Sequence, residues 1–407
     1  MAVAKGVLDK IIDGINKKAG KVVVDRAVNM MEQLKIEFIP TPSLELNMAM
    51  GGGCAVGRVI EFAGEQSSGK TSMALEIISD DQKVHPEGVW GWFETEASYD
   101  PDYAKDVHGV DLNRIIYWDM DDLGAENGLD VLEALIRSND LRGVVVNSVA
   151  GLSTIREMNS QMAEVGVAET ARMMSKLMRK IVAIANKTKT TCIFINQFRA
   201  TMDKYKPTVT TGGKALGFFA SQRVDFNKIK LEAKDGYDEE EAMKVQCRVR
   251  KNRCTYTNPY KKCQYIVKYG EGIDLIGEIT NAACEQGILR KSGAWIFYEK
   301  DDGDCVVRDG VMVVQKDESV IQQDGVLMKW NGAAKLLAFF QNNPDFYTEI
   351  RTLMMARLLA GEVKTMGLDV EEVDQIVAED AELAEVFIEV IADETTVGSD
   401  EEEGEPV

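Results

Sequence analysis

The chain has 407 residues, of which 45% are hydrophobic and 28% charged; this is typical of a globular protein with one large domain and one or two smaller ones. No apolar run approaches the roughly 20 residues that a membrane-spanning helix needs, and no secretory signal is visible. We therefore expect a cytoplasmic protein with no membrane partner. The seven cysteines form no C-x-x-C pair, which favours free thiols over zinc ligands or disulfides.

The net charge of −20 is concentrated at one end of the chain. From Met366 onward there are 16 acidic and no basic residues, so −16 of the total lies there and only −4 remains for residues 1–365. A nearly neutral body can still carry a local basic groove. The overall charge therefore does not exclude a nucleic acid partner.

The N-terminal segment is predicted to be helical. Apolar residues recur at helical spacing within residues 3–34, and Pro40, Pro42 and Gly51–Gly53 interrupt the segment that follows. We assign residues 1–38 to an N-terminal helical segment.

Between about residues 58 and 230, short β-branched or apolar runs alternate with helical segments, which indicates a parallel sheet flanked by helices. The predicted strands are Arg58–Ala63, Val89–Phe93, Ile115–Trp118, Gly143–Val146 and Thr191–Asn196. Two later runs, Val245–Val249 and Gln264–Tyr269, are expected to join the same sheet. The core domain is expected to cover residues 39–272.

After Gly270–Gly272 the pattern changes to that of a smaller α+β domain, assigned to residues 273–392. It is expected to include helices at Tyr347–Leu359 and at residues 367–391. Residues 393–407 are too charged and too poor in apolar residues to fold, so they are predicted to be a disordered acidic tail.

A phosphate-binding loop follows the first predicted strand. The spacing G-x-x-x-x-G-K-[ST] is met between that strand and the helix expected at Ser72–Ile78. Its members are Gly64, Glu65, Gln66, Ser67, Ser68, Gly69, Lys70 and Thr71. In such a loop the backbone N–H groups surround the phosphates, the lysine contacts the β- and γ-phosphates, and the hydroxyl binds magnesium. The sequence thus predicts an α/β P-loop ATPase core that uses ATP and Mg²⁺.

Hydrolysis requires a residue that orients or activates water, and Glu96, at the end of a predicted strand, is the candidate. Nearby, in the segment that begins at Asp100, Tyr103 is an aromatic candidate for stacking on adenine, although core packing explains it equally well. The strand Gly143–Val146 ends in Asn147, where a P-loop protein usually has a magnesium-side Asp.

The helix predicted at about Glu169–Ala185 has one apolar and one basic face, and it is followed by a strand and a long polar loop that ends in Gly212 and Gly213. Long loops with a glycine end inside a compact domain are more often functional than accidental. By itself, the basic face is better explained as a solvated surface than as a binding site.

In combination, these segments resemble the RecA family of homologous-recombination ATPases. The resemblance runs in family order from about residue 40 to 300. The matching stretches are the P-loop, Phe93–Pro101, Ala171–Lys180, Phe194–Gln197, Thr210–Gly213, Lys251–Arg253 and Tyr269–Ile273.

The resemblance implies specific roles in catalysis and nucleotide binding. Glu96 would activate water, Lys70 would bind phosphate and Gln197 would sense the γ-phosphate. Lys251 and Arg253 would reach the ATP of a neighbouring subunit. The remaining implied residues are Asp100, Tyr103 and Tyr269 around the nucleotide, and Thr71 and Asn147 around magnesium.

The resemblance also implies single- and double-stranded DNA as partners and a homo-oligomeric helical filament. Phe218 and the N-terminal helix would dock on the adjacent subunit. The DNA contacts would come from Val167, Arg172, Ser175, Arg179, Arg199, Met202, Thr211, Gly212, Gly213 and Lys214.

The expected function is an ATP-dependent, DNA-stimulated recombinase. One alternative is a filament protein that binds ATP as a switch with little hydrolysis, which Asn147 keeps open. Another is a helicase with the same ATPase core. Two positions depart from the family pattern, namely Asn147 in place of Asp and Gly217 in place of the common Lys.

Overall fold

The computed structural model describes most of the chain up to Asn343. The described residues are 7–30, 35–120, 124–156, 169–201, 208–232, 237–255, 262–285, 287–293, 295–300, 313–314, 319–322, 325–331, 333–343, 346, 350 and 353. The chain forms two compact units: Met1–Ile229 with Val245–Gln264, and Lys230–Lys244 with Tyr265–Val407.

A ten-stranded sheet carries the candidate site. Its strand order is β12-β11-β10-β9-β3-β7-β6-β4-β5, with β8 paired to β7. The strands β9, β3, β7, β6, β4 and β5 pair in parallel, which confirms the predicted mostly parallel sheet. These strands span Gln222–Ile229, Val59–Gly64, Thr191–Ala200, Leu141–Asn147, Val89–Glu94 and Ile115–Asp119. The others are β8 (Thr208–Thr210), β10 (Ala242–Asn252), β11 (Lys262–Lys268) and β12 (Gly272–Ile273), so both late runs join the sheet as expected.

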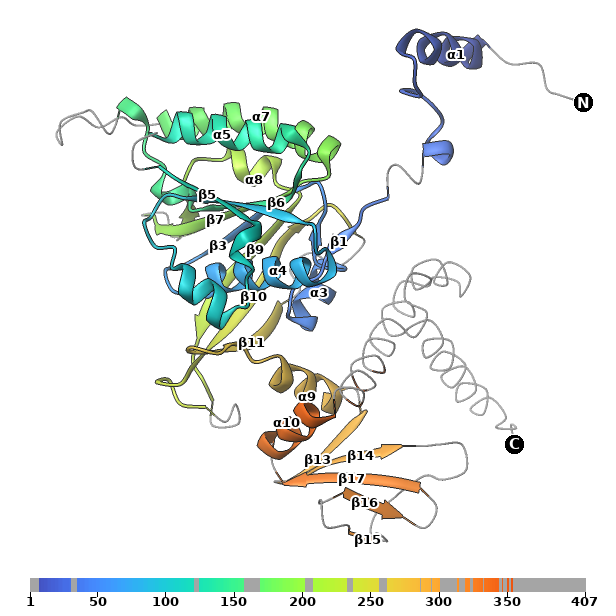
Figure 1. Cartoon of the computed structure of the whole chain (residues 1–407), viewed down its shortest axis with the longest axis vertical. Helices are drawn as coiled ribbons and strands as arrows, with labels where there is room; N and C mark the ends of the chain where they lie inside the picture. Colours follow the sequence, from blue (N-terminus) through green and yellow to red (C-terminus); the bar gives the residue numbers. More distant parts are fainter. Residues whose placement is uncertain are drawn as a thin grey trace, which may run out of the picture. The chain divides into compact units, whose positions relative to one another are not determined.

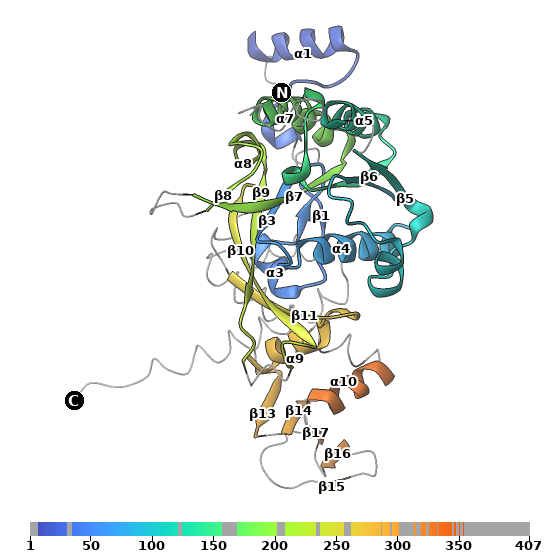
Figure 2. The same cartoon turned by 90° about the vertical axis from the view of Figure 1, so that its left-hand side faces the viewer.

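Helices cover both faces of this sheet, which explains why its central strands are continuously apolar. Figures 1 and 2 show α5 (Gly124–Ser138), α7 (Glu169–Thr188) and α8 (Ala215–Phe219) over one face, and α4 (Lys70–Val84) over the other. The apolar sides of α5 and α7 form one buried cluster with β4, β6 and β7. Parallel strands with covered faces direct all their carboxyl ends to one edge, where ligands bind in such sheets.

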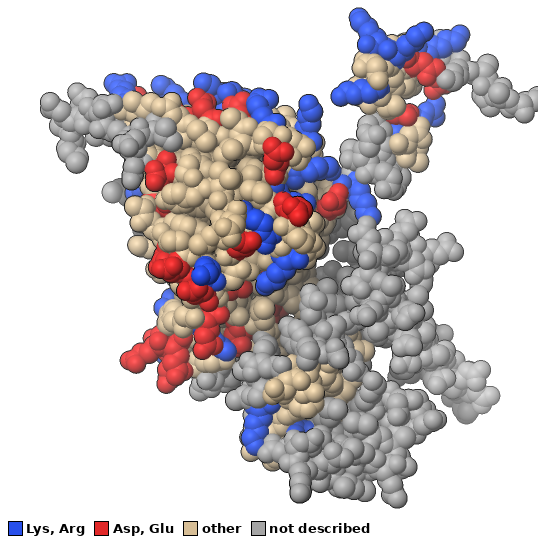
Figure 3. Space-filling view, viewed as in Figure 1, with Lys and Arg blue, Asp and Glu red and all other residues tan. Residues whose placement is uncertain are grey.

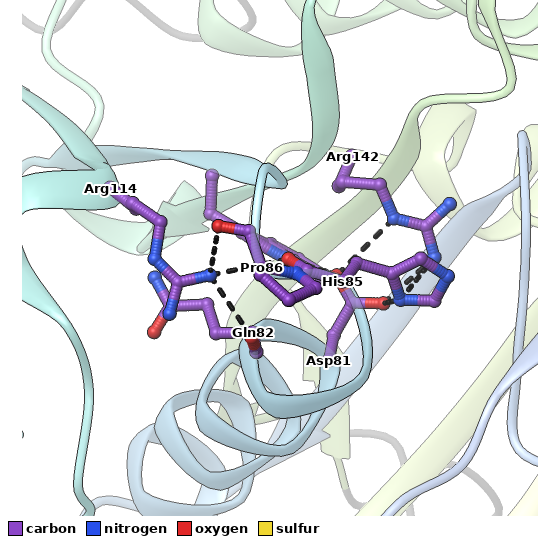
Figure 4. A network of polar contacts seen from close by, with 7 residues as sticks. Asp81, Gln82, His85, Pro86, Arg114 and Arg142 are labelled. Atoms are coloured by element: carbon purple, nitrogen blue, oxygen red, sulfur yellow. Dashed lines mark hydrogen bonds and ion pairs between the residues drawn. The ribbon is translucent and has the colours of Figure 1, made fainter.

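The far end of α4 is held by two arginines from neighbouring segments (Figure 4). Arg114, in the 3-10 turn η3 (Leu112–Arg114), donates from Nη1 to the carbonyl oxygens of Gln82, His85 and Pro86 at 3.0–3.2 Å. Arg142 donates to the buried carboxylate of Asp81 at 2.8 Å. Positive charge at the C-terminal end of a helix is favourable, so these contacts fix the helix whose first residue is Lys70.

The N-terminal helix is shorter than predicted. α1 covers Val7–Ala19, and a 3-10 turn, η1, covers Ala27–Met30, whereas residues 3–34 were expected to be one helix. Gly20 adopts the left-handed region with φ 69°, which ends the helix. The side chain of Asn16 then accepts from the N–H groups of Val23 and Val24, at 2.8 and 3.0 Å, and turns the chain back. Two short strands, β1 (Phe38–Ile39) and β2 (Cys54–Ala55), pair with each other in antiparallel fashion, and α3 (Leu44–Met50) lies between them in the sequence.

The second unit contains a five-stranded antiparallel sheet, as expected for a smaller α+β segment. Its order is β13-β14-β17-β16-β15. The bounds are Leu289–Ser292, Trp295–Lys300, Gly325–Asn331, Ser319–Gln322 and Val313–Val314, with helices α9 (Leu275–Glu285) and α10 (Ala333–Asn342). The predicted helices after residue 346 lie outside the described residues except at Ile350 and Leu353, and the predicted tail at 393–407 lies outside them entirely.

The following findings on membrane-spanning helices and on cysteines apply only to the described part of the chain. None of the described helices combines the length and the apolar character that a bilayer span requires. The described cysteines are free thiols.

Candidate nucleotide-binding site and the surfaces around it

The P-loop connects the end of β3 to the start of α4 and leaves no room for side chains at its first glycine. A Cβ on Gly64 would lie 2.3 Å from the carbonyl oxygen of Phe226 and 2.6 Å from Ser68 Oγ. Gly69 caps α4 with a left-handed φ of 86°. The free N–H groups of the first helical turn therefore face the loop, and a helix N-terminus of this kind favours an anion. The shape of the loop fits phosphate.

Lys70 lies buried inside this loop, with 6% of its surface exposed. Its Nζ donates to the carbonyl oxygens of Gly64 (3.4 Å) and Glu65 (2.5 Å) and to Ser68 Oγ (3.1 Å). Burial lowers the pKa of Lys70 to about 8, although the carboxylates of Glu96 and Glu65 oppose the shift. A cation that is held only by neutral oxygens within the loop is suited to exchange them for phosphate oxygens.

Thr71 follows Lys70 in the first turn of α4 and is half-buried. Its hydroxyl is a hard oxygen donor of the kind that magnesium accepts. Among the described residues there is no group of three or more His, Cys, Asp or Glu side chains that could hold a metal ion. At a nucleotide site of this kind, Thr71 and the phosphates would hold a magnesium ion.

The ends of β4, β6 and β7 bring three polar side chains together beside the P-loop. Glu96 Oε1 accepts a hydrogen bond from Gln197 Nε2 at 2.8 Å and a short one from the hydroxyl of Ser148. Glu96 also acts electrostatically on Lys70. The candidate catalytic residues Lys70, Glu96 and Gln197, which are far apart in sequence, therefore share one edge of the sheet.

Asn147, the residue in place of the usual Asp, is 3% exposed at the end of β6. Its Nδ2 donates to Glu94 Oε2 at 3.0 Å and to Ser98 Oγ at 3.3 Å. The amide nitrogen of Asn147 is thus used by residues of β4 and of the segment that follows it. The predicted magnesium role would fall to the amide oxygen, Oδ1. Sequence reasoning assigned no role to Ser148, because its contact with Glu96 depends on the neighbouring strands and not on a local pattern.

The residues proposed to contact adenine lie in a short loop that packs on α4. Asp100 Oδ1 accepts from the N–H groups of Asp102 and Tyr103, at 3.0 and 3.1 Å, just before the π-helical turn η2 (Tyr103–Val107). The ring of Tyr103 meets the buried ring of His108 edge-on at 4.8 Å. Tyr103 is thus partly exposed and well supported, as a base platform needs to be.

Tyr269, also predicted to bind nucleotide, belongs to the second unit. The residue is 48% exposed, and its backbone N–H donates to the carbonyl of Glu241 at 2.9 Å.

A chain of hydrogen bonds leads from the catalytic edge to the end of the polar loop. Asn196, next to Gln197 on β7, is fully buried, and its Nδ2 donates to Glu61 Oε1 (2.9 Å) and to the carbonyl oxygen of Thr211 (3.1 Å). Thr211 Oγ1 donates back to Asn196 Oδ1 at 2.5 Å. Two adjacent residues of one strand therefore connect Glu96 with Thr211.

The glycines after Thr211 pack closely on η4 (Val149–Gly151) and α7. Gly212 and Gly213 have left-handed φ values of 75° and 77°. A Cβ on Gly213 would lie 2.8 Å from the Cβ of Ala171, and one on Gly212 would lie 2.7 Å from Val149. These positions accept only glycine, so the end of the polar loop is held beside the first turn of α7.

The basic face of α7 is exposed, as predicted. Arg172, Lys176 and Arg179 are exposed, whereas the apolar stripe from Met174 to Ile184 is buried. Ser175 donates to the carbonyl of Ala171 at 2.8 Å, so its proton is used within the helix. Figure 3 shows Lys and Arg side chains along the side of the molecule formed by α5 and α7.

Of four other DNA candidates, two lie within the described residues. Arg199 is exposed on β7 opposite Val209, and Lys214 is exposed before α8. Val167 and Met202 lie outside the described residues.

Lys251 and Arg253, at the end of β10 and just beyond it, lie near α8. Lys251 Nζ donates to the carbonyl oxygens of Gly217 (3.0 Å) and Phe218 (2.8 Å). Burial lowers its pKa to about 8, with further contributions from Arg253 and Arg223. A Cβ on Gly217 would lie 3.1 Å from the Arg223 guanidinium. Glycine at this position therefore adds neither a side chain nor a further cation beside an already positive cluster.

Comparison with known proteins identifies similar sequences. The model of the RecA N-terminal domain matches residues 6–274. A protein named Protein RecA from Ruminococcus albus is 38% identical over 298 residues, which is 72% of this chain and 72% of the relative. The namesake from Streptomyces rimosus is 39% identical over 299 residues, 72% of this chain and 76% of the relative. The one from Nocardioides sp. is 34% identical over 368 residues, 90% of this chain and 94% of the relative.

Proposed function

The chain belongs to the RecA family, and we propose that it works as an ATP-dependent DNA recombinase that assembles on single-stranded DNA, pairs it with homologous duplex and exchanges the strands. The observation that carries this proposal is the convergence of Lys70, Glu96 and Gln197 at one sheet edge, with Asn196 and Thr211 leading away from it. A site of this kind can bind a nucleotide and link its state to a loop.

The division of labour within the site follows from these contacts. Lys70 would hold the β- and γ-phosphates, and Thr71 would hold magnesium, which supplies positive charge to the phosphates when bound. Glu96 would accept the proton of the water that attacks the γ-phosphorus while the bond to the ADP oxygen breaks. Gln197 donates to Glu96 in this structure, so a change at Glu96 or at the γ-phosphate would alter its hydrogen bond. Asn196 and Thr211 would transmit that change to the polar loop.

Oligomerisation is supported by exposed apolar side chains at two places. On α1, Leu8, Ile11 and Ile15 are 63%, 53% and 42% exposed and follow helical spacing. Phe218 on α8 is 69% exposed. An apolar helix stripe of this kind requires a partner. We propose that neighbouring copies of the chain cover it in a helical filament.

The proposed function is tested by electron microscopy and by phosphate release. With ATP, magnesium and single-stranded DNA, the chain should form helical filaments and release phosphate faster than without DNA. Rings in place of filaments would indicate a helicase-like assembly. Filaments without phosphate release would indicate an ATP-binding switch.

The basic face of α7 is proposed to contact the DNA backbone, and this predicts a change in salt dependence. Arg172→Ala and Arg179→Ala should each weaken single-strand binding equally for all sequences. Each lost phosphate contact should lower the magnitude of the log–log salt slope by roughly 0.7. Fluorescence anisotropy titrations at several salt concentrations measure the slope.

The matched control for these two variants is Lys187→Ala, because Lys187 is an exposed cation in the last turn of the same helix. It lies 15 residues after Arg172, which corresponds to about 22 Å along the axis. Its slope should match that of the original protein. Unchanged slopes for Arg172→Ala and Arg179→Ala would show that this face is merely solvated.

A further inference from the structure

Glu94 is a buried carboxylate that is stabilised by hydrogen bonds alone. It is 1% exposed at the end of β4, and no described Lys or Arg forms an ion pair with it. Its Oε2 accepts from Trp92 Nε1 and from Asn147 Nδ2, both at 3.0 Å. Its Oε1 accepts from the N–H of Glu96 at 2.8 Å and from Ser98 Oγ and N at 3.3 and 3.4 Å. A buried charge without a counter-ion needs each of these donors.

Glu94 and Asn147 are each connected to Glu96, one by a hydrogen bond and the other through the next residue in the chain. Glu94 holds the backbone N–H of Glu96, and so fixes the peptide from which that side chain projects. Asn147 precedes Ser148, whose hydroxyl donates to Glu96 Oε1. The side chain of Glu96 is exposed, so packing contributes little to its orientation. Its direction therefore depends on its hydrogen bonds with Ser148 and Gln197 and on the backbone N–H that Glu94 holds.

We propose that Glu94 is the positioning residue that aims Glu96, and that residue 147 is an amide because it must donate to Glu94. Of the two residues Glu94 and Asn147, only Glu94, on β4, has a carboxylate, so the pair carries a single negative charge. This inference rests on the proposed role of Glu96 in hydrolysis.

If Asn147 were only a lost carboxylate, Asn147→Asp should improve the site; under this proposal it should impair it. An aspartate at position 147 would restore the residue that is usual in P-loop proteins, yet it would place two buried carboxylates about as close as the present 3.0 Å between Nδ2 and Oε2. Like charges at this separation in a buried site repel strongly. The two side chains would be pushed apart, which would disturb the hydrogen bond from the Glu96 N–H to Glu94 and so the direction of Glu96. A displacement of 1 Å in a catalytic group can lower the rate up to about 100-fold.

Exchanging both residues should relieve the conflict. In a chain with Glu94→Gln and Asn147→Asp together, the amide nitrogen introduced at position 94 can donate to the carboxylate introduced at position 147, so the pair regains one charge and one hydrogen bond. The amide oxygen at position 94 can still accept from the N–H of Glu96. The hydrogen bond from Trp92 is lost, because its N–H would then face an amide nitrogen. The rescue should therefore be partial.

The experiment is a double-mutant cycle of Glu94→Gln, Asn147→Asp and the two combined, measured by DNA-stimulated phosphate release. Each single variant should lose about tenfold or more in kcat. For Glu94→Gln, affinity for a fluorescent ATP analogue without DNA should stay within about twofold, because the P-loop is unchanged. The combined variant should be at least several times faster than Asn147→Asp. Melting temperatures should follow the same order, which tests the coupling independently of activity.

The matched control is Asn113→Asp. Asn113 donates from Nδ2 to Asp111 Oδ1 at 3.0 Å, the same separation as in the buried pair, but at an exposed position where water screens the charges. Its kcat should not change. The inference is overturned if the effects of the two single changes simply multiply in the combined variant, or if neither single change lowers kcat. A Glu96→Ala variant that hydrolyses ATP normally would instead contradict the proposed function.

Discussion

Lys70→Ala is expected to abolish ATP-dependent filament assembly and to lower phosphate release at least about 100-fold. Residues 64–71 contain no other Lys or Arg, so no cation of the loop can replace the lost ammonium at the β- and γ-phosphates. Assembly is a sensitive measurement, because the proposed filament interface closes around bound nucleotide. Electron microscopy with ATP and single-stranded DNA, together with phosphate release, measures both effects.

Lys83→Ala provides the control for this prediction. Lys83 lies in the last turn of the same helix, is 69% exposed and pairs with Asp80 at 2.8 Å on the surface. Exposed pairs of this kind contribute about 0–1 kcal/mol, so assembly should be unaffected. Circular dichroism of Lys70→Ala should show an intact fold, since the ammonium bonds only to loop oxygens and a serine hydroxyl. Filaments of ordinary length from Lys70→Ala would contradict the assignment of the P-loop.

The sheet and its order of elements were predictable because each central strand is a short apolar run bounded by turn residues. The length of β7 was not. It was expected to end at Asn196 but continues to Ala200, because its extension pairs with Thr208–Thr210 across the polar loop. The N-terminal helix was predicted too long, because apolar spacing alone does not show that Gly20 adopts a left-handed conformation.

For the candidate site, local spacing pointed to the P-loop, a place at a strand end pointed to Glu96, and resemblance pointed to Gln197, but none of these showed what holds the three parts. The contact between Ser148 and Glu96 arises because β6 lies beside β4 in the sheet, a relation that residue types do not reveal. Asn147 illustrates the same limit. In the sequence it is a missing carboxylate, whereas in the structure it is the donor that a buried carboxylate on the next strand requires.

Lys251→Ala is expected to remove most DNA-stimulated hydrolysis while leaving ATP binding to the free chain nearly intact. Within one chain, Lys251 is bonded to the carbonyl oxygens of Gly217 and Phe218 on α8. We propose that in a filament it reaches the γ-phosphate of a neighbouring subunit and stabilises the charge that develops there. The catalytic site would then combine Glu96 of one copy with Lys251 of the next, and mixed filaments test this directly.

Filaments mixed from equal amounts of Lys251→Ala and Glu96→Ala chains should regain hydrolysis that neither variant has alone. In a head-to-tail assembly, a site is complete where a Lys251→Ala chain, with its own Glu96, meets a Glu96→Ala neighbour with an intact Lys251. Random mixing makes about a quarter of the junctions complete, so about a quarter of the original rate should return. Mixing Lys251→Ala with a chain that carries both changes creates no complete junction and is the control. A mixture that is no faster than the mean of its two components would show that Lys251 acts within its own subunit.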